Sequence, residues 1–386
     1  MNTKQLDKKY IANTYGRFDL HIVEGKGSLC YDDNGKEYID LGSGIGVNAF
    51  GYSDKVWVDA VEEQLHKIQH TSNLYYTSPC ARLAEIMCKK SGMQKVFFAN
   101  SGAEANECAI KAAREWAAVE KGEEYYTIVT LVNSFHGRTV TTLAATGQDV
   151  FHEKFNPLTP GFVYAVANDK EDLREKVKNN KCAAIMFEFV QGEGGVVPLD
   201  KDFVEEIFNL AKEYNLLTIA DEVQTGNGRL GDIYGYMKYG VNPDIVTTAK
   251  GLGGGLPIGA AMFNQKTMDV YKPGMHGSTF GGNPIAAAGA ISIMERLTDD
   301  FMNEVNEKSQ YIINALNGAK GIKSISGMGL MLGIETEKDA GEVIAKCMEL
   351  GALPLKAKNK VRLLPPLNIS MEEIKKAVEI IKTACM

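Results

Sequence analysis

The feature that most constrains the fold of this chain is a regular alternation of strand-like and helix-like segments between Lys95 and Phe263. Short apolar runs rich in β-branched residues are expected to be strands, at 95–99, 126–132, 162–167, 182–190, 216–220, 245–249 and 260–263. Segments with apolar residues every three to four positions are expected to be helices, at 103–121, 170–178 and 202–214. Parallel strands need long connections, usually helices, so this alternation predicts an α/β fold with a mostly parallel sheet between helices.

The two ends of the chain have a different pattern and are expected to form a smaller α+β unit together. A polar arm comes first, followed by two short strands around Asp32-Asp33-Asn34-Gly35, where Asn-Gly after a strand is a strong hairpin signal. A chain of 386 residues is also longer than a single core usually supports. We therefore expect an arm and part of a small domain at 1–50, a large domain at 51–283, and the rest of the small domain at 284–386.

Composition argues against several classes of partner. The net charge of −7 disfavours binding to nucleic acid or to an anionic membrane surface. The seven cysteines are scattered and form no C-x-x-C pair, a pattern typical of reduced thiols in a cytoplasmic protein rather than of disulfides or a zinc site. The first residues do not resemble a signal peptide, and no apolar run reaches the ~18 residues of a membrane span. We therefore expect a cytoplasmic protein without a metal site.

One lysine stands at the end of an apolar run. Lys250 closes the run that begins at Asp244, and a glycine-rich turn from Gly251 to Gly259 follows it directly. Burial favours the neutral amine, which lowers the pKa of a lysine and makes it a nucleophile, as in lysines that form Schiff bases. A lysine on an edge strand that extends to solvent is the alternative, since lysine is seldom fully buried.

A turn of small residues offers an anion site. The run Ser101-Gly102-Ala103 lies between an expected strand and an expected helix. The backbone N–H groups at a helix N-terminus carry about half a positive charge, so a phosphate would bind well there. A simple cap is the alternative, with Ser101 or Asn100 as the N-cap and Glu104 completing a capping box.

Two carboxylates, Asp221 and Glu222, follow the apolar run 216–220. In open α/β sheets, ligands bind at the carboxyl ends of strands. A carboxylate there would hold a proton on a heterocyclic nitrogen, or bind Mg²⁺ as in an ATPase. The ATPase alternative requires G-x-x-x-x-G-K-[ST], and neither Gly-Lys-Ser nor Gly-Lys-Thr occurs in the chain. A solvated strand end remains the other alternative.

Three further motifs are weaker. Phe135-His136-Gly137-Arg138 follows a strand, where an aromatic ring would stack on a planar cofactor and an arginine would bind a carboxylate. Ser278 and Thr279 offer hydroxyls for a phosphate or carboxylate, or cap the helix expected after Pro284. The run Gly226–Gly231 matches the dinucleotide motif G-x-G-x-x-G, but no strand precedes it and no helix follows it, so we set the match aside.

An amine, a strand-end carboxylate, a phosphate turn and an aromatic ring on one sheet together suit a phosphorylated pyridine aldehyde. The sequence resembles, over essentially its whole length, the class III, fold-type-I, pyridoxal-phosphate-dependent aminotransferases. The segments that carry the resemblance are Asn100–Glu107, Phe135–Thr139, Gln191–Gly195, Asp221–Gly226, Lys250–Gly259 and Ser278–Asn283, with Asn73–Tyr76 and Arg362–Leu367 in addition. The resemblance implies the fold-type-I architecture and pyridoxal 5'-phosphate as cofactor.

The resemblance also implies roles for residues around the cofactor. Lys250 would bond to the cofactor and later move the proton between substrate and cofactor, and Asp221 would keep the pyridine nitrogen protonated. The other implied cofactor-binding residues are Ser101, Gly102 and Ala103 at the phosphate, Phe135 and Val223 on the two faces of the ring, Gln224 near its phenolic oxygen, and Thr279 at the phosphate of a neighbouring subunit. The role of Thr279 implies a homodimer.

Five residues are implied to bind substrates. Arg138 and Ser278 would bind the carboxylate end of the amino donor, with Tyr15 nearby. Arg362 would bind the α-carboxylate of glutamate or 2-oxoglutarate, with Glu193 as its partner. The implied activity is transfer of the terminal amino group of N2-acetyl-L-ornithine to 2-oxoglutarate, a step of arginine biosynthesis that gives N-acetyl-L-glutamate 5-semialdehyde and L-glutamate.

Several alternatives stay open at this point. Ornithine, succinylornithine and 4-aminobutyrate are other amino donors that such a site serves, and an aminomutase acting on glutamate semialdehyde is a different reaction on the same fold. A non-catalytic binding protein is disfavoured because Lys250 and Asp221 are both present. Phe189, Asn227 and Leu230 depart from the usual family pattern, which puts the amino-donor preference in question rather than the chemistry.

Overall fold

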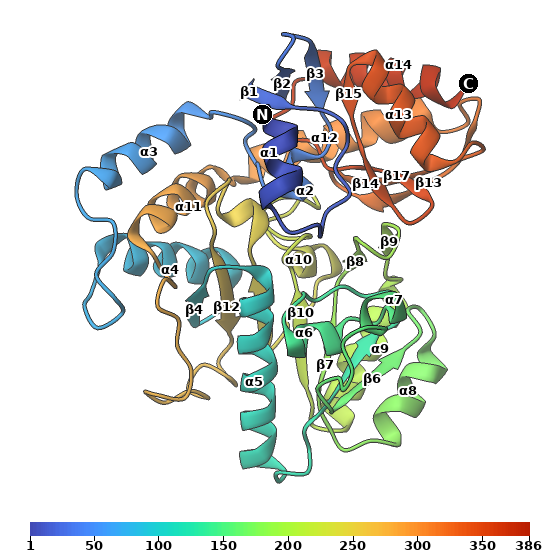
Figure 1. Ribbon diagram of the computed structural model, residues 1–386. Helices are drawn as coiled ribbons and strands as arrows, with labels where there is room; N and C mark the ends of the chain where they lie inside the picture. The colour runs from blue at the N-terminus through green and yellow to red at the C-terminus, as the bar shows by residue number, and fades with distance from the viewer.

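A seven-stranded sheet forms the centre of the computed structural model, which describes residues 1–386 (Figure 1). The order of its strands is β4–β12–β11–β10–β7–β5–β6. Their bounds are Lys95–Ala99 for β4, Thr127–Leu131 for β5, Phe162–Ala165 for β6, Cys182–Phe187 for β7, Leu217–Asp221 for β10, Ile245–Thr248 for β11 and Gly259–Phe263 for β12. Only β12 runs antiparallel to its neighbours, and all other pairs are parallel. The α/β class with a mostly parallel sheet is therefore confirmed.

Helices cover both faces of this sheet. Every residue of β7, β10, β11 and β12 is buried, and because neighbouring side chains on a strand point to opposite faces, both faces must be covered. The longest covering helix, α5, presents small buried residues such as Ala109 and Ala112 to the sheet. The helices between residues 55 and 296 are α3 (Lys55–Leu65), α4 (Ser78–Ser91), α5 (Gly102–Glu120), α6 (Val140–Ala145), α7 (Asp149–His152), α8 (Lys170–Lys178), α9 (Lys201–Glu213), α10 (Gly235–Tyr239) and α11 (Pro284–Arg296).

The two ends of the chain share a second sheet, with strand order β1–β2–β3–β15. Its strands are β1 (Ile22–Lys26), β2 (Leu29–Asp32), β3 (Glu37–Asp40) and β15 (Ala352–Leu353). The hairpin expected at Asp32–Gly35 is present, since β2 and β3 pair antiparallel around it. Ala352 pairs with Ile39 in parallel, so the first strands lie beside the last part of the chain, as the blue and red strands in Figure 1 show.

The remaining elements complete the small unit and its approach to the large sheet. A four-stranded sheet has the order β13–β14–β17–β16, and a short pair joins β8 to β9. The bounds are α1 (Thr3–Tyr10), α2 (Ser43–Gly46), β8 (Val190–Gln191), β9 (Val197–Pro198), α12 (Asp299–Leu316), β13 (Ile322–Met328), β14 (Met331–Thr336), α13 (Ala340–Leu350), β16 (Leu355–Ala357), β17 (Lys360–Leu363) and α14 (Met371–Cys385).

One expected strand is shorter in the structure. The apolar pattern predicts a continuous strand at 182–190, but β7 ends at Phe187 and the chain turns away at Glu188. The carboxylate of Glu188 accepts hydrogen bonds from the backbone N–H groups of Phe135 (3.0 Å) and Gly192 (3.3 Å), which draws the chain out of the sheet. A local apolar pattern does not reveal such a side chain–backbone interaction.

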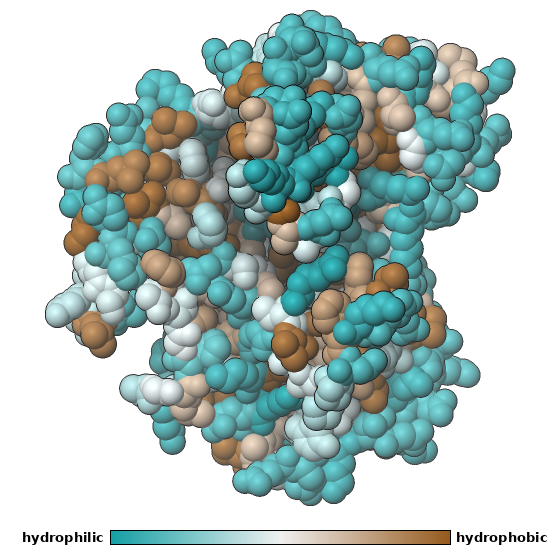
Figure 2. Space-filling view, in the orientation of Figure 1, coloured by the Kyte–Doolittle hydropathy of each residue, from teal (hydrophilic) through white to brown (hydrophobic).

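The largest apolar core extends through both units and includes Phe189, Leu230 and Leu332, all fully buried. All seven cysteines are free thiols. Exposed apolar and aromatic side chains gather instead on and after α3: Val56, Val58, Leu65, Ile68, Leu74, Tyr75 and Tyr76. Figure 2 shows a brown surface in the region of α3. None of the helices is both long and apolar enough for a membrane span.

Candidate active site

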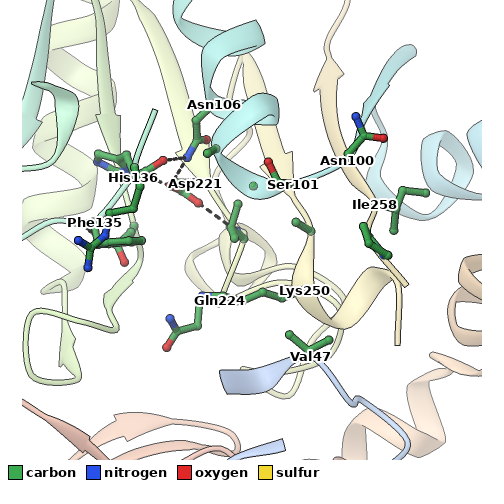
Figure 3. Close-up of a pocket in the computed structure, with 18 of the residues that line it drawn as sticks. Val47, Asn100, Ser101, Asn106, Phe135, His136, Asp221, Gln224, Lys250 and Ile258 are labelled. Carbon is green, nitrogen blue, oxygen red and sulfur yellow. Dashed lines mark hydrogen bonds and ion pairs between the residues drawn. The ribbon is translucent and has the colours of Figure 1, made fainter. Parts of the chain in front are cut away.

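A cavity of about 410 Å³ lies at the carboxyl ends of the central strands (Figure 3). Its wall contains most of the residues expected at the cofactor, together with Arg138, which is expected at the substrate; the cofactor residues are Ser101, Gly102, Ala103, Phe135, Asp221, Val223, Gln224 and Lys250. These residues come from separate parts of the chain and meet because parallel strands end at the same edge of the sheet. No group of three or more His, Cys, Asp or Glu side chains is arranged to hold a metal ion.

The N-terminus of α5 faces this cavity. Ser101 is the N-cap, and its hydroxyl accepts the N–H of Glu104 at 3.2 Å. The Glu104 carboxylate in turn accepts the N–H of Asn100 at 2.6 Å, one residue earlier than in a standard capping box. The N–H groups of Gly102 and Ala103 have no partners within the helix, as in any first helical turn. The helix is thus capped as the simpler alternative expects, and it still offers two donors to an anion.

Gly102 is required by close packing. A Cβ atom at this position would lie 2.6 Å from Cγ1 of Val223, which lines the same cavity. The start of α5 therefore lies so close to the side chain of Val223 that only glycine fits there.

Asp221 is held in a buried hydrogen-bond network, drawn in Figure 3. Its Oδ2 accepts from Nδ2 of Asn106 (2.8 Å) and lies 2.7 Å from Nδ1 of His136, and its Oδ1 accepts from the N–H of Val223 (3.0 Å). Asn106 is fixed in turn, because its Oδ1 accepts from the hydroxyl of Thr247 at 2.6 Å. The carboxylate therefore has one orientation, and Nε2 of His136 is buried without a partner.

Lys250 lies just beyond β11, in the short 3₁₀ turn Lys250–Leu252. Its backbone has a φ of 41°, in the left-handed region that side chains disfavour. The side chain lines the cavity, and burial lowers the pKa of its amine, an effect that Glu193 opposes and Arg362 strengthens. A buried amine with a lowered pKa is the state that the sequence indicates for a nucleophilic lysine.

An ion pair lies beside the cavity. Nη1 of Arg362 is 2.6 Å from Oε1 of Glu193, and the Arg362 side chain is only 3% exposed. Gln224, which lines the cavity, contacts both partners: its Oε1 accepts from Arg362 at 3.2 Å and its Nε2 donates to Glu193 at 3.4 Å. Burial raises the pKa of Glu193, but the charge and hydrogen bonds of Arg362 outweigh it and leave the pKa below its ordinary value.

Two aromatic rings hold Arg138 at the cavity wall. Its guanidinium carbon is 4.2 Å from the ring centre of Phe151 and 5.7 Å from that of Phe135. Ser278 does not line the cavity, but its hydroxyl oxygen accepts from Nδ2 of Asn100, which does, at 3.1 Å. The ring contacts hold a cation at the cavity wall, and the Asn100 contact fixes the Ser278 hydroxyl beside a lining residue.

Five of the expected site residues do not line the cavity in the single chain: Tyr15, Glu193, Ser278, Thr279 and Arg362. Tyr15 is 70% exposed on the N-terminal arm, and Thr279 is exposed on the loop before α11. Neither lines the cavity, so their roles stay predictions that depend on a second subunit.

Several residues of the site have no role assigned from the sequence. Asn106, His136 and Glu188 are buried and line the cavity, and Val47 enters it from the N-terminal segment. His136 and Glu188 stand directly after Phe135 and at the end of β7. Their position at strand ends could have marked them as site residues from the sequence. Asn106 lies inside a helix, where no sequence pattern distinguishes it.

Comparison with family models identifies the class of protein to which this chain belongs. The model of aminotransferase class-III matches residues 10–385, and the chain belongs to that family. It is therefore a pyridoxal-phosphate-dependent aminotransferase of fold type I.

Comparison with individual proteins indicates which aminotransferases this chain is similar to. The chain is 48% identical to the acetylornithine aminotransferase of Haemophilus ducreyi, over 98% of this chain and 97% of that protein. Among solved structures, it is similar to the ornithine aminotransferase of Toxoplasma gondii, with a TM-score of 0.94, 31% identity, and coverage of 99% and 93% of the two chains. It is also similar to the N-acetylornithine aminotransferase of Stenotrophomonas maltophilia, with a TM-score of 0.85, 32% identity, and coverage of 98% and 97%.

The residues present suit pyridoxal phosphate. A fixed, buried carboxylate at Asp221 is the acceptor that a protonated ring nitrogen needs, and the free N–H groups at the start of α5 suit a phosphate. Nδ1 of His136 lies 2.7 Å from Oδ2 of Asp221, and its Nε2 is buried without a partner. Lys250 supplies the amine that an aldehyde requires.

Proposed function

We propose that this protein transfers the terminal amino group of N2-acetyl-L-ornithine to 2-oxoglutarate, giving N-acetyl-L-glutamate 5-semialdehyde and L-glutamate. The observation that carries the proposal is the ion pair between Glu193 and Arg362, connected to the cavity by Gln224. The 48% identity to an acetylornithine aminotransferase supports the same donor. Such a pair answers the main chemical difficulty of the reaction, which is that one cavity must accept two unlike amino donors.

The two donors differ next to the carbon that reacts. Acetylornithine reacts at a terminal carbon without a carboxylate, whereas glutamate reacts at a carbon that carries one. An unpaired Arg362 would attract the carboxylate end of the diamino donor to the wrong place. Glu193 neutralises Arg362 while the terminal amine reacts, and it separates from Arg362 when glutamate or 2-oxoglutarate brings its own carboxylate.

The residues around Lys250 serve the proton transfer. When bound, pyridoxal phosphate supplies an electron-withdrawing ring next to the reacting carbon. Nζ of Lys250 would hold the cofactor through its aldehyde and would carry a proton to and from the substrate carbon. Asp221 would hold a proton on the pyridine nitrogen, and Asn106 and His136 keep its carboxylate in place.

Other residues bind and orient. The N–H groups of Gly102 and Ala103, with the Ser101 hydroxyl, would bind the phosphate, and Phe135, Val223 and Gln224, which line the same cavity, would hold the ring. Arg138 and Ser278 bind the carboxylate of the acylated donor, with Tyr15 nearby.

The protein acts as a homodimer in this proposal. Exposed apolar and aromatic side chains gather on α3 and at 74–76, and a contiguous surface of this kind marks an interaction site. Phe280, next to Thr279, is also 60% exposed. A second copy of the chain would cover these side chains and bring Thr279 to the phosphate of the neighbouring cavity. The seven free thiols suit the reducing conditions of a cytoplasm, where we place the enzyme.

Free ornithine is the second candidate donor, because the backbone matches an ornithine aminotransferase with a TM-score of 0.94. Initial rates with acetylornithine, ornithine, succinylornithine and 4-aminobutyrate, each with 2-oxoglutarate, test the choice. We expect the highest kcat/KM with acetylornithine. A higher value for any other donor contradicts the proposal, and turnover of glutamate semialdehyde without 2-oxoglutarate would indicate an aminomutase.

A further inference from the structure

The loop Gly226–Gly231, whose glycine pattern does not bind a dinucleotide, packs beneath the turn that carries Lys250. Asn227 in this loop is 1% exposed, and Nδ2 of its side chain donates two hydrogen bonds. The acceptors are Oγ1 of Thr248 at 2.8 Å and the carbonyl oxygen of Ala249 at 3.1 Å. These are the two residues immediately before Lys250.

The backbone at Lys250 needs such support. Its φ of 41° is disfavoured for any residue with a Cβ, and it persists only where the surroundings hold it. The hydrogen bonds from Asn227 act on the last residue of β11 and on the peptide that leads into Lys250, so they fix the direction in which the lysine leaves the strand.

The loop itself is anchored independently of Lys250. Nη1 of Arg229 donates to the carbonyl oxygens of Leu330 (3.0 Å) and Pro365 (2.6 Å), and Asn306 donates to the carbonyl oxygen of Gly231 at 2.8 Å. The side chain of Asn227 therefore extends from a loop whose backbone is held by contacts that do not involve Lys250.

Asparagine suits this place for two reasons. Its own φ is 55°, a conformation that asparagine tolerates better than most residues with a side chain. Its amide also donates two hydrogen bonds from one nitrogen, which no apolar side chain provides. The departure from the family pattern at this position thus has a specific structural consequence.

We propose that Asn227 is a positioning residue for Lys250, holding the strained turn so that the amine faces the cofactor aldehyde before the cofactor binds. The inference rests on the proposed role of Lys250 as the residue that bonds to pyridoxal phosphate. Without Asn227 the turn relaxes in the cofactor-free protein, and ordering it again opposes formation of the bond.

A double-mutant cycle on cofactor affinity tests this proposal. Asn227→Gly removes the amide and accepts the positive φ, so it does not introduce backbone strain. The dissociation constant of pyridoxal phosphate is measured by titration of the cofactor-free protein for the parent, Asn227→Gly, Lys250→Ala and the double variant. Since each hydrogen bond contributes roughly a fivefold factor and Asn227 donates two, we expect Asn227→Gly to weaken binding by up to about 25-fold with Lys250 present and less than about twofold in the Lys250→Ala background.

Two controls separate positioning from general support. Gln64→Ala removes a buried amide on α3, away from this loop, that donates to the carbonyl oxygen of Ile68 at 2.9 Å; it should leave the cofactor affinity within about twofold, while lowering the melting temperature. Thr248→Val keeps the shape of a β-strand residue and removes one of the two acceptors, so it should weaken binding by a smaller factor than Asn227→Gly. It also provides the measurement if Asn227→Gly does not fold.

The outcomes are distinct. Equal weakening by Asn227→Gly in both backgrounds, or no weakening in either, overturns the role of Asn227 and leaves the proposed function intact. If Lys250→Ala itself leaves the affinity unchanged, and borohydride reduction of the parent fixes the cofactor on another lysine, the proposed role of Lys250 fails and that of Asn227 fails with it.

Discussion

Replacement of Glu193 by alanine is the most informative test of how one cavity serves two amino donors. The side chain of Arg362 is 3% exposed and that of Glu193 is 29% exposed, with 2.6 Å between Nη1 and Oε1. Breaking such a buried pair by removing one partner usually costs about 3–5 kcal/mol, because the remaining charge is left uncompensated. Gln224 remains as an acceptor for Arg362 at 3.2 Å, so we take the lower end of this range.

The cost has opposite effects on the two half-reactions. Glutamate must displace Glu193 from Arg362, and Glu193→Ala removes that requirement. In the same variant, acetylornithine reacts beside an Arg362 whose charge is uncompensated. About 3 kcal/mol corresponds to roughly two orders of magnitude in rate. We therefore expect the ratio of rate constants, glutamate over acetylornithine, to rise between about tenfold and a hundredfold.

Single-turnover absorbance measurements of each half-reaction give this ratio directly. Glu193→Gln keeps the shape without the charge and should give an intermediate ratio, while Arg362→Ala should impair glutamate most. Glu206→Gln is the matched control, because Glu206 pairs with Arg174 away from the cavity. Equal changes for both donors in Glu193→Ala would mean that Glu193 has only a structural role.

Three further predictions concern the cofactor and the buried carboxyl groups. Lys250→Ala should fold but lack the covalent link to the cofactor, and peptide mapping after borohydride reduction of the parent should place the label on Lys250 and on no other lysine. Asp221→Asn should still bind cofactor but lose about a hundredfold or more in kcat, because the proton on the ring nitrogen loses its counter-charge; turnover within a few-fold of the parent would refute this role. Burial raises the pKa of Glu188 from 4.5 to about 7, so the folded protein holds this proton more tightly than the unfolded chain. The stability that this proton contributes is fully present below the pKa of the unfolded chain and is lost as the pH rises through about 7. Urea titrations of the parent and of Glu188→Gln at several pH values should therefore show the difference in unfolding free energy shifting in favour of the variant by up to about 3 kcal/mol as the pH rises. A difference that does not depend on pH would contradict this prediction.

The order of strands and helices in the large unit could be predicted from local patterns, whereas strand direction could not. The run at 260–263 has the same apolar character as its parallel neighbours, yet β12 is antiparallel to β11 and β4. Its direction follows from the connection: the chain returns through the turn Lys250–Leu252 and its glycines instead of through a covering helix.

Residues that act at strand ends could likewise be found from the sequence, because the place itself indicates a ligand. Residues that act by holding another residue in place could not be found in this way. Asn106 is one polar residue among many on α5, and only the tertiary structure brings it to 2.8 Å from Asp221. The same holds for Asn227, whose acceptors at Thr248 and Ala249 lie on and just after another strand.

The pairing of Ala352 with Ile39 has a consequence for synthesis of the protein on the ribosome. Until residue 352 has left the exit tunnel, one edge of β3 has no partner, and an open strand edge is a template for pairing with other chains. Closing so long a stretch of chain is also slow compared with local folding. Nascent chains should therefore need protection of Glu37–Asp40 by a chaperone for most of the time of synthesis, and products truncated before β15 should aggregate through this edge.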